Sequence, residues 1–280
     1  MELFDDVIRS RQNRAVVELC KLTERKHREE KRLFRFDGIK LLDEAIQKDL
    51  SIEGVFLRED KSESIRAFLA ERHGTDVFTR LGTVRTVSED VFEKISEEKS
   101  PEGVITIAKY IDKFEKFATI YNSADFFKVK KSPIVLLESV RDPSNLGAIV
   151  RSAAALGVQA LIVSKDCADI YHPKAIRASM GMIFGQAIYR VDDLTQVIGL
   201  LQKSGRRVFA ATLEERSVVL GRFPLIAGDC VVIGNEGHGI SKETVSACDH
   251  SILIPMQPMA ESFNAAVAAS ILMWVFSKLN

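Results

Sequence analysis

The sequence predicts an α/β protein built from two domains. Strand-like and helix-like segments alternate along most of the chain, and the alternation is interrupted once, at residues 113–132. A length of 280 residues suits two domains of ordinary size, and a hydrophobic fraction of 46% is sufficient for a core. We therefore predict a smaller α/β domain at 1–112, a linker at 113–132 and a parallel-sheet domain at 133–280. An additional helix packed on one domain is the other interpretation of 113–132.

The elements of the first domain follow from their apolar spacing. Residues 13–32 carry a helical stripe of Val16, Leu19, Cys20 and Leu22 opposite a basic face. A short strand at 33–36 precedes a helix with Ile39, Leu42, Ala45 and Ile46 on one side. The elements expected after these are a strand at 52–58, a helix at 62–74, β-prone pieces at 77–81 and 83–87, a helix at 88–95 and a strand at 103–110.

The second domain is predicted to hold a parallel sheet. Its strand-like segments are near-continuous apolar runs, which are typical of parallel strands covered on both faces. The runs lie at 134–140, 160–164, 207–213, 230–236 and 251–256, and helices fit between or after them at 147–156, 173–180, 193–203, 241–248 and 262–278.

Composition excludes several classes of protein. Lys plus Arg equals Asp plus Glu, 39 each, so net charge does not point to nucleic acid, although ten basic residues face four acidic ones between Arg9 and Arg35. The four cysteines are widely spaced and the five histidines show no metal-ligand spacing, so we expect reduced, mostly buried thiols and no metal site. The start resembles no secretory signal, and the longest apolar stretch, near 265–276, is too short to span a membrane. We expect a soluble cytoplasmic protein.

Unusual sequence follows three of the predicted parallel strands. Ligands of open parallel sheets bind outside the carboxyl ends of the strands. The three segments read ESVRDPSNLGAIVR from residue 138, IGNEGHGIS at 233–241 and IPMQPMAESFNAA at 254–266. They bring polar residues together among glycines and prolines that allow a close approach of the backbone. The polar candidates are Asn145, Arg151, Asn235, Glu236, Ser262 and Asn264.

Each candidate also has a purely structural interpretation. The glycines of the GNEGHG loop could simply allow the positive φ angles that the loop needs. Asn145 could be an N-cap, and Glu236 could be a solvated charge. Arg151 could lie on an exposed helix face, but the small residues around it, such as Ala148 and Ala154, argue against that. The structural interpretations are less convincing in combination, because each of the three strand ends would need its own.

The three segments resemble, in order, the signature motifs of the SpoU-type 2′-O-ribose RNA methyltransferases of the SPOUT class. The stretch from Asn13 to Ala45 and SPEGVITIAK at 100–109 are similar to the substrate-recognition domain that precedes the catalytic domain in many members. The resemblance implies a deep trefoil knot in the C-terminal domain, S-adenosylmethionine as the cofactor and a homodimer with its active site near the interface. The implied cofactor-binding positions are Thr212, Gly234, Asn235, Gly239, Ile254, Met256 and Phe263.

The resemblance also implies roles for the catalytic candidates, which are Arg151, Asn145, Glu236, Ser262 and Asn264. Arginine hardly deprotonates, so Arg151 is expected to grip a phosphate or to stabilise the forming alkoxide, and a role as base stays open. Asn145 and Asn264 would order the loops and Arg151, and Glu236 would orient polar partners. Ser262 would cap the last helix.

The predicted activity is transfer of a methyl group to a ribose 2′-hydroxyl, with large-subunit (23S) rRNA as the expected substrate. The basic N-terminal segment would then contact RNA phosphates through Lys26, Arg28, Lys31 and Arg32. Its structural alternative is a solvated face paired with Glu24, Glu29 and Glu30. The alternatives in function are a tRNA 2′-O-methyltransferase, a non-catalytic RNA-binding assembly factor and a nucleotide-binding oxidoreductase. The last is disfavoured because the G-x-G-x-x-G fingerprint is absent.

Overall fold

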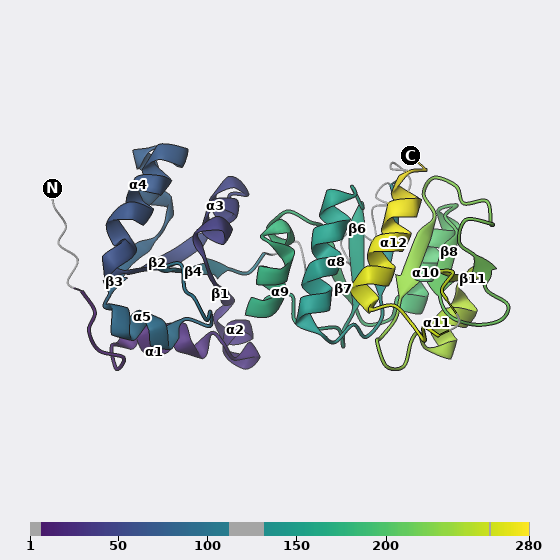
Figure 1. The fold of residues 1–280 in the computed structure, drawn as a ribbon, viewed down its shortest axis with the longest axis horizontal. Coiled ribbons are helices and arrows are strands. Elements are labelled where there is room, and N and C mark those ends of the chain that lie inside the picture. The colour runs from purple at the N-terminus through teal and green to yellow at the C-terminus, as the bar shows by residue number, and fades with distance from the viewer. Residues whose placement is uncertain (1–6, 112–131, 258, 280) are drawn as a thin grey trace. The chain divides into compact units, whose positions relative to one another are not determined.

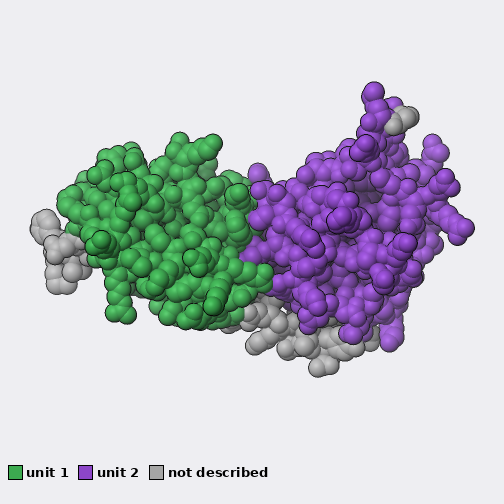
Figure 2. Space-filling model, turned by 90° about the horizontal axis from the view of Figure 1, so that it is seen from below, with its two compact units in different colours: residues 1–111, 171–184 green, residues 112–170, 185–280 purple. Residues whose placement is uncertain are grey.

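The computed structural model describes residues 7–111, 132–257 and 259–279. The chain divides into two compact units, one of residues 1–111 with 171–184 and one of 112–170 with 185–280 (Figure 2). Apart from Ser132, the predicted linker at 113–132 lies outside the described residues. The predicted domain bounds therefore stay a prediction.

The first unit is a mixed four-stranded sheet with helices packed on it (Figure 1). The strand order is β1 (Leu33–Asp37), β4 (Val104–Lys109), β2 (Ile52–Arg58) and β3 (Thr83–Val87), and only β2 and β3 run parallel. On β1, Phe34 and Phe36 enter an aromatic core with Tyr171 and Phe184, whose rings lie 4.8 and 5.2 Å from theirs. The helices are α1 (Arg14–Lys21), α2 (Arg25–Lys31), α3 (Ile39–Gln47), α4 (Ser62–His73), α5 (Glu89–Ile95) and α9 (Pro173–Ser179).

The second unit is a seven-stranded, fully parallel sheet. Its order is β7 (Ile188–Val191), β6 (Ala160–Ser164), β5 (Ile134–Leu137), β10 (Cys230–Ile233), β8 (Val208–Ala211), β11 (His250–Leu253) and β9 (Val218–Val219). β10 is inserted between β5 and β8, although about 90 residues of sequence separate it from β5. The carboxyl ends of all these strands meet at one edge, because the strands run in the same direction.

Helices cover this sheet on both faces, as the apolar runs predicted. Ile134 and Leu136 of β5 pack with the apolar side of α10 (Leu194–Lys203). Val135 and Leu137 are equally buried and must point to the opposite face, since successive side chains alternate. There α12 (Ala265–Ser277) lies beside α8 (Pro143–Ala155) and packs on β10 (Figure 1). A short helix, α11 (Lys242–Ala247), packs on α10.

One predicted β-prone piece was wrong, and two strands were not predicted. Residues 77–81 were expected in a β-prone piece, but Thr75–Arg80 form a 3₁₀ helix that buries only Val77, which shows how far β-propensity depends on context. The strands β7 and β9 were missed. β7 is an edge strand with Arg190 exposed, and β9 is two residues long, so neither forms a continuous apolar run.

Within the described residues, no helix is long and apolar enough to cross a membrane.

The predicted helix at 13–32 is broken into α1 and α2. Arg28 explains the break: its side chain is 1% exposed and donates from Nη1 to the carbonyl oxygens of Leu22 and Thr23, at 2.9 and 2.6 Å. These carbonyls lie just past the end of α1, where helix geometry leaves acceptors without intrahelical donors. Arg28 is thus a buried structural residue. Its predicted contact with RNA phosphate is wrong, because the guanidinium faces inward.

Candidate active site

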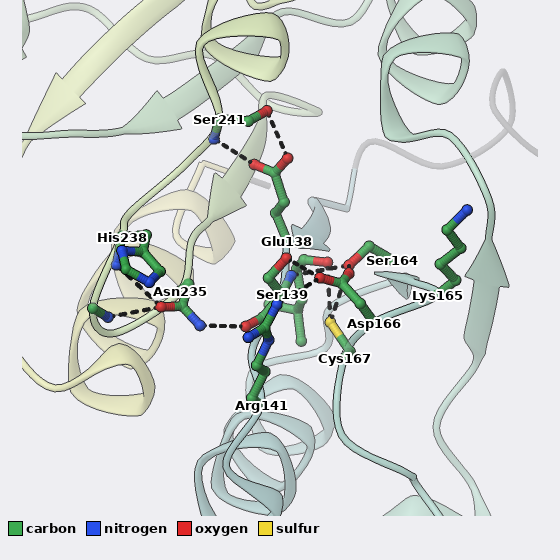
Figure 3. Close-up of polar contacts among 12 residues, drawn as sticks. Glu138, Ser139, Arg141, Ser164, Lys165, Asp166, Cys167, Asn235, His238 and Ser241 are labelled. Atoms are coloured by element: carbon green, nitrogen blue, oxygen red, sulfur yellow. Dashed lines mark hydrogen bonds and ion pairs between the residues drawn. The ribbon is translucent and has the colours of Figure 1, made fainter.

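The loop that follows β10 is a tight turn closed by Asn235 and Gly239. The backbone N–H of each donates to the carbonyl oxygen of the other, at 2.9 and 3.0 Å. Inside the turn, Asn235 Oδ1 accepts from the amides of Gly237 and His238, at 2.8 and 3.1 Å (Figure 3). Gly234 is required for this closure, since an added Cβ would lie 2.4 Å from the carbonyl carbon of Gly239. The turn therefore holds its residues in one conformation.

Three of the predicted catalytic residues form one hydrogen-bonded chain. Asn145 Nδ2 donates to Glu236 Oε1 at 2.6 Å, and Asn264 Nδ2 donates to Asn145 Oδ1 at 3.0 Å. Asn145 lies in the first turn of α8, Glu236 in the turn after β10 and Asn264 at the start of α12. The chain thus links the three loops that carried the sequence motifs, and it fixes the orientation of the Glu236 carboxylate.

A cavity of about 570 Å³ opens beside this chain of residues. Its volume lies within the range of roughly 300–1,000 Å³ that is usual for small-molecule sites. The loops after β8, β10 and β11 and the first turns of α12 form its walls. All seven predicted cofactor-binding residues line it: Thr212, Gly234, Asn235, Gly239, Ile254, Met256 and Phe263. The catalytic candidates Glu236 and Ser262 line it as well.

Two carboxylates of this cavity were missed by the sequence analysis. Glu214 and Glu261 line it together with Glu236, and the described lining contains no lysine or arginine. Glu261 lies within a motif segment, but Glu214 follows β8 in a stretch without any recognisable pattern. The cavity is therefore acidic, which suits a ligand that carries positive charge.

Ser262 does not have its predicted role. The N-cap of α12 is Asn264, whose Oδ1 accepts from the amides of Ala266 and Val267 at 2.9 and 3.3 Å. The helix begins at Ala265, so Ser262 stands too far before it to cap it. The predicted N-cap interpretation of Asn145 is also wrong, since Asp142 caps α8 through the amides of Ser144 and Asn145. Ser262 is left as an exposed polar group in the cavity wall.

Arg151 lies on α8 and is exposed in the single chain. The prediction that its small neighbours keep it off an exposed face is wrong. The small residues have another purpose: Ala153 is buried, and the hydroxyl groups of Ser152 and Ser270 lie 2.8 Å apart where α8 meets α12. Small side chains allow two helices to approach closely, whereas Arg151 on the same helix stays exposed. It does not line the cavity.

The remaining basic candidates lie in the first unit. Lys26 and Lys31 are exposed on α2, and the guanidinium of Arg32 lies 4.6 Å from the centre of the Tyr110 ring. Arg25, on the same helix, is paired with Glu29 at 2.8 Å, so the structural alternative applies to part of this face. Lys26 and Lys31 are thus solvent-exposed cations on this helix.

The cysteines do not contribute to this cavity, and the described residues form no metal-binding group. All four cysteines are free thiols; Cys167 and Cys230 are buried, and burial raises the pKa of Cys230 to about 11. None of the four lines the cavity. In the part of the chain that the structure describes, no group of three or more His, Cys, Asp or Glu side chains could hold a metal ion.

Comparison with known proteins identifies the family. A model of the SpoU rRNA Methylase family matches residues 132–274, more than half of the chain. The chain belongs to the SpoU rRNA methylase family. A model of the MRM3-like substrate binding domain matches residues 13–106. The predicted family and the predicted enzyme class, an RNA methyltransferase, are therefore confirmed.

One curated relative and one solved structure match over nearly the full length, and a second relative matches over about two thirds. The 23S rRNA (guanosine(2553)-2'-O)-methyltransferase RlmP of Bacillus subtilis is 26% identical, over 95% of this chain and 97% of its own. The 23S rRNA (uridine(2479)-2'-O)-methyltransferase of Streptomyces viridochromogenes is 32% identical, over 69% of this chain and 68% of its own. The AdoMet-bound rRNA methyltransferase of Sinorhizobium meliloti is a structural neighbour with a TM-score of 0.80 and 27% identity, covering 97% of this chain and 96% of that one. The predicted SPOUT fold, which is knotted in these methyltransferases, is confirmed.

Proposed function

We propose that this SpoU family member methylates a ribose 2′-hydroxyl of 23S rRNA and uses S-adenosylmethionine as the methyl donor. The observation that carries the proposal is the chain Asn264–Asn145–Glu236 beside the 570 Å³ cavity. It joins a small-molecule site to a set of oriented polar groups. The relatives named for 23S rRNA 2′-O-methylation support rRNA over tRNA, and the intact site gives no support to a non-catalytic assembly factor.

The cavity fits the donor in shape and charge. Gly234 lets the turn close tightly against Gly239, so backbone groups can form the wall of the cavity. The acidic lining, with Glu214, Glu236 and Glu261, complements a sulfonium and an ammonium group. When bound, S-adenosylmethionine supplies an electrophilic methyl group on sulfur. The apolar Ile254, Met256 and Phe263 would exclude water around that methyl group.

Glu236 and Arg151 of this protein would supply orientation and electrostatic stabilisation for the reaction. Glu236 is held by Asn145 at 2.6 Å and can accept a hydrogen bond from a polar group of the substrate. Arg151 is exposed and is proposed to grip an RNA phosphate next to the reacting ribose, or to stabilise the alkoxide that forms as the hydroxyl passes its proton to solvent water. A guanidinium acts poorly as a base, but that role stays an alternative.

We also propose that the enzyme acts as a homodimer formed by the methyltransferase domain. The side chains of Phe263, Val267 and Trp274 are 38%, 46% and 51% exposed, which is unusual for large apolar groups on and just before one helix. A second copy that covers α12 would bring its own groups near the exposed Arg151. The first unit would hold the RNA through Lys26 and Lys31. A cytoplasmic location is proposed because it would bring the enzyme together with the proposed rRNA substrate.

One experiment tests the reaction and its substrate together. Purified full-length protein is incubated with radiolabelled S-adenosylmethionine and either 23S rRNA or bulk tRNA, and the RNA is digested to nucleosides for mass spectrometry. We expect label in a single 2′-O-methylnucleoside of 23S rRNA. Label confined to tRNA, or found on a base, would contradict the proposal. Light scattering of the same sample measures the oligomeric state. The Trp274→Glu variant tests whether the exposed apolar residues of α12 form the dimer interface.

A further inference from the structure

Ser139 has an unusual backbone conformation at the carboxyl end of β5. Its φ angle is +55°, in the left-handed region that residues other than glycine rarely adopt. Such a conformation persists only where the surrounding contacts hold it. The amide of Ser139 donates to Ser164 Oγ at 2.9 Å, and its hydroxyl donates to Asp166 Oδ2 (Figure 3). Both partners lie at the end of the neighbouring strand, β6.

Asp166 is the centre of these contacts. Its other oxygen, Oδ1, accepts from the Ser164 hydroxyl at 2.6 Å, and Arg141 Nη2 lies 3.6 Å from Oδ2. Burial raises the pKa of Asp166, but hydrogen bonds from Ser139 and Ser164 outweigh it, so the pKa lies below its usual value. The group is therefore a carboxylate at neutral pH, and it accepts from two hydroxyls at once.

The contacts reach the candidate active site through the carbonyl oxygen of Ser139. Asn235 Nδ2 donates to this oxygen at 2.7 Å, while Asn235 Oδ1 holds the amides of Gly237 and His238 (Figure 3). The side chain of Asn235 thus connects the strained residue on one side with the turn on the other. Glu236, within that turn, is the residue that Asn145 contacts.

We infer that Asp166 and Ser139 are positioning residues that set the place of the 235–239 turn, and through it the place of Glu236 and the cavity wall. The inference rests on the proposed function of that turn. The geometry explains why a serine is kept in a left-handed conformation: the conformation aims its hydroxyl at Asp166 and its carbonyl at Asn235. Neither residue lines the cavity, so both act through Asn235.

Ser139→Gly separates positioning from stability. Glycine accepts the left-handed φ without strain, so the relief offsets the lost hydrogen bond and the melting temperature should stay near that of the wild type. The backbone contacts of residue 139 with Ser164 and Asn235 remain possible, but without the hydroxyl bond to Asp166 the carbonyl that holds Asn235 is less firmly fixed. A displacement of the turn by about 1 Å can lower kcat by about 100-fold. Asp166→Ala should lower kcat by a similar factor. The double variant should be no slower than either single one, since both changes remove one connection.

Asp193→Ala is the matched control. Asp193 caps α10 and accepts from the Thr195 hydroxyl at 2.6 Å, but it has no contact with the turn. It should lower the melting temperature and leave kcat unchanged.

Hydrogen exchange at the amides of Gly237 and His238 and S-adenosylhomocysteine affinity by calorimetry are measured without RNA. They therefore report on positioning even if the wild type does not methylate 23S rRNA. We expect faster exchange and weaker binding in Ser139→Gly and Asp166→Ala. Wild-type exchange and binding in both variants overturn the inference, and so does an equal loss of kcat in Asp193→Ala.

Discussion

Removal of the Arg28 side chain should destabilise the first unit rather than weaken a direct RNA contact. In Arg28→Ala the carbonyl oxygens of Leu22 and Thr23 lose their donor. A buried acceptor without a partner costs about 1–3 kcal/mol, and the carbonyl of the exposed Thr23 costs less because water reaches it. With the lost packing of the aliphatic stem, we expect a loss of about 3 kcal/mol in the free energy of unfolding.

The magnitude can be measured by calorimetry on the full chain. For a unit of this size, 1 kcal/mol shifts the melting temperature by roughly 4 °C, so the melting temperature of the first unit should fall by about 12 °C. Arg28→Met keeps the volume of the stem but not the donors, so it should recover only the packing part of the loss. Lys26→Ala is the exposed control, with little effect on melting.

RNA binding distinguishes the two interpretations of this segment. Below its melting temperature, Arg28→Ala should bind RNA with the wild-type salt dependence, since no phosphate contact is removed. Lys26→Ala combined with Lys31→Ala should weaken binding and reduce the slope of log K against log salt by about 1–2. If Arg28→Ala melts like the wild type but binds RNA with a smaller salt slope, the reasoning from its burial is refuted.

Three further predictions concern the site and the pH dependence of stability. Asn145→Ala breaks both contacts of the Asn264–Asn145–Glu236 chain and should lower kcat by about 100-fold with S-adenosylhomocysteine affinity nearly unchanged; a normal kcat in single-turnover assays would contradict the proposed role. Arg151→Ala should also lose about 100-fold in rate, and Arg151→Lys should be nearly as slow if a two-pronged phosphate contact matters. A lysine variant whose rate rises as the pH approaches the lysine pKa would instead identify a base. Burial raises the pKa of Asp43, but hydrogen bonds led by Arg72 outweigh it and leave the pKa lowered. Its stabilising contribution is thus present above the unfolded pKa of 3.8 and is lost as the pH falls through the folded value, so Asp43→Asn should lower the melting temperature at pH 6 and have little effect at pH 2.

Most of the fold and the location of the candidate site could be predicted from local sequence. The apolar runs of β5, β6, β8, β10 and β11 identified a parallel sheet, because strands buried on both faces need apolar residues throughout. The three motif segments are contiguous, so the sequence displays them directly. Strand ends of a parallel sheet meet at one edge, which is why the site could be placed there before any contact was known.

Only the tertiary structure decided which residues meet and which are hidden. Asn145 contacts Glu236 across 91 positions of sequence because β10 is inserted beside β5, and that order is not encoded in the spacing of either segment. Arg28 resembled its exposed neighbours in the sequence, yet it is buried because a helix end needed a donor. The same holds for Asp166, which lies in no motif: its proposed role follows from its contact with Ser139, just past the end of the neighbouring strand β5. Charged and polar side chains have several possible partners, and packing alone selects among them.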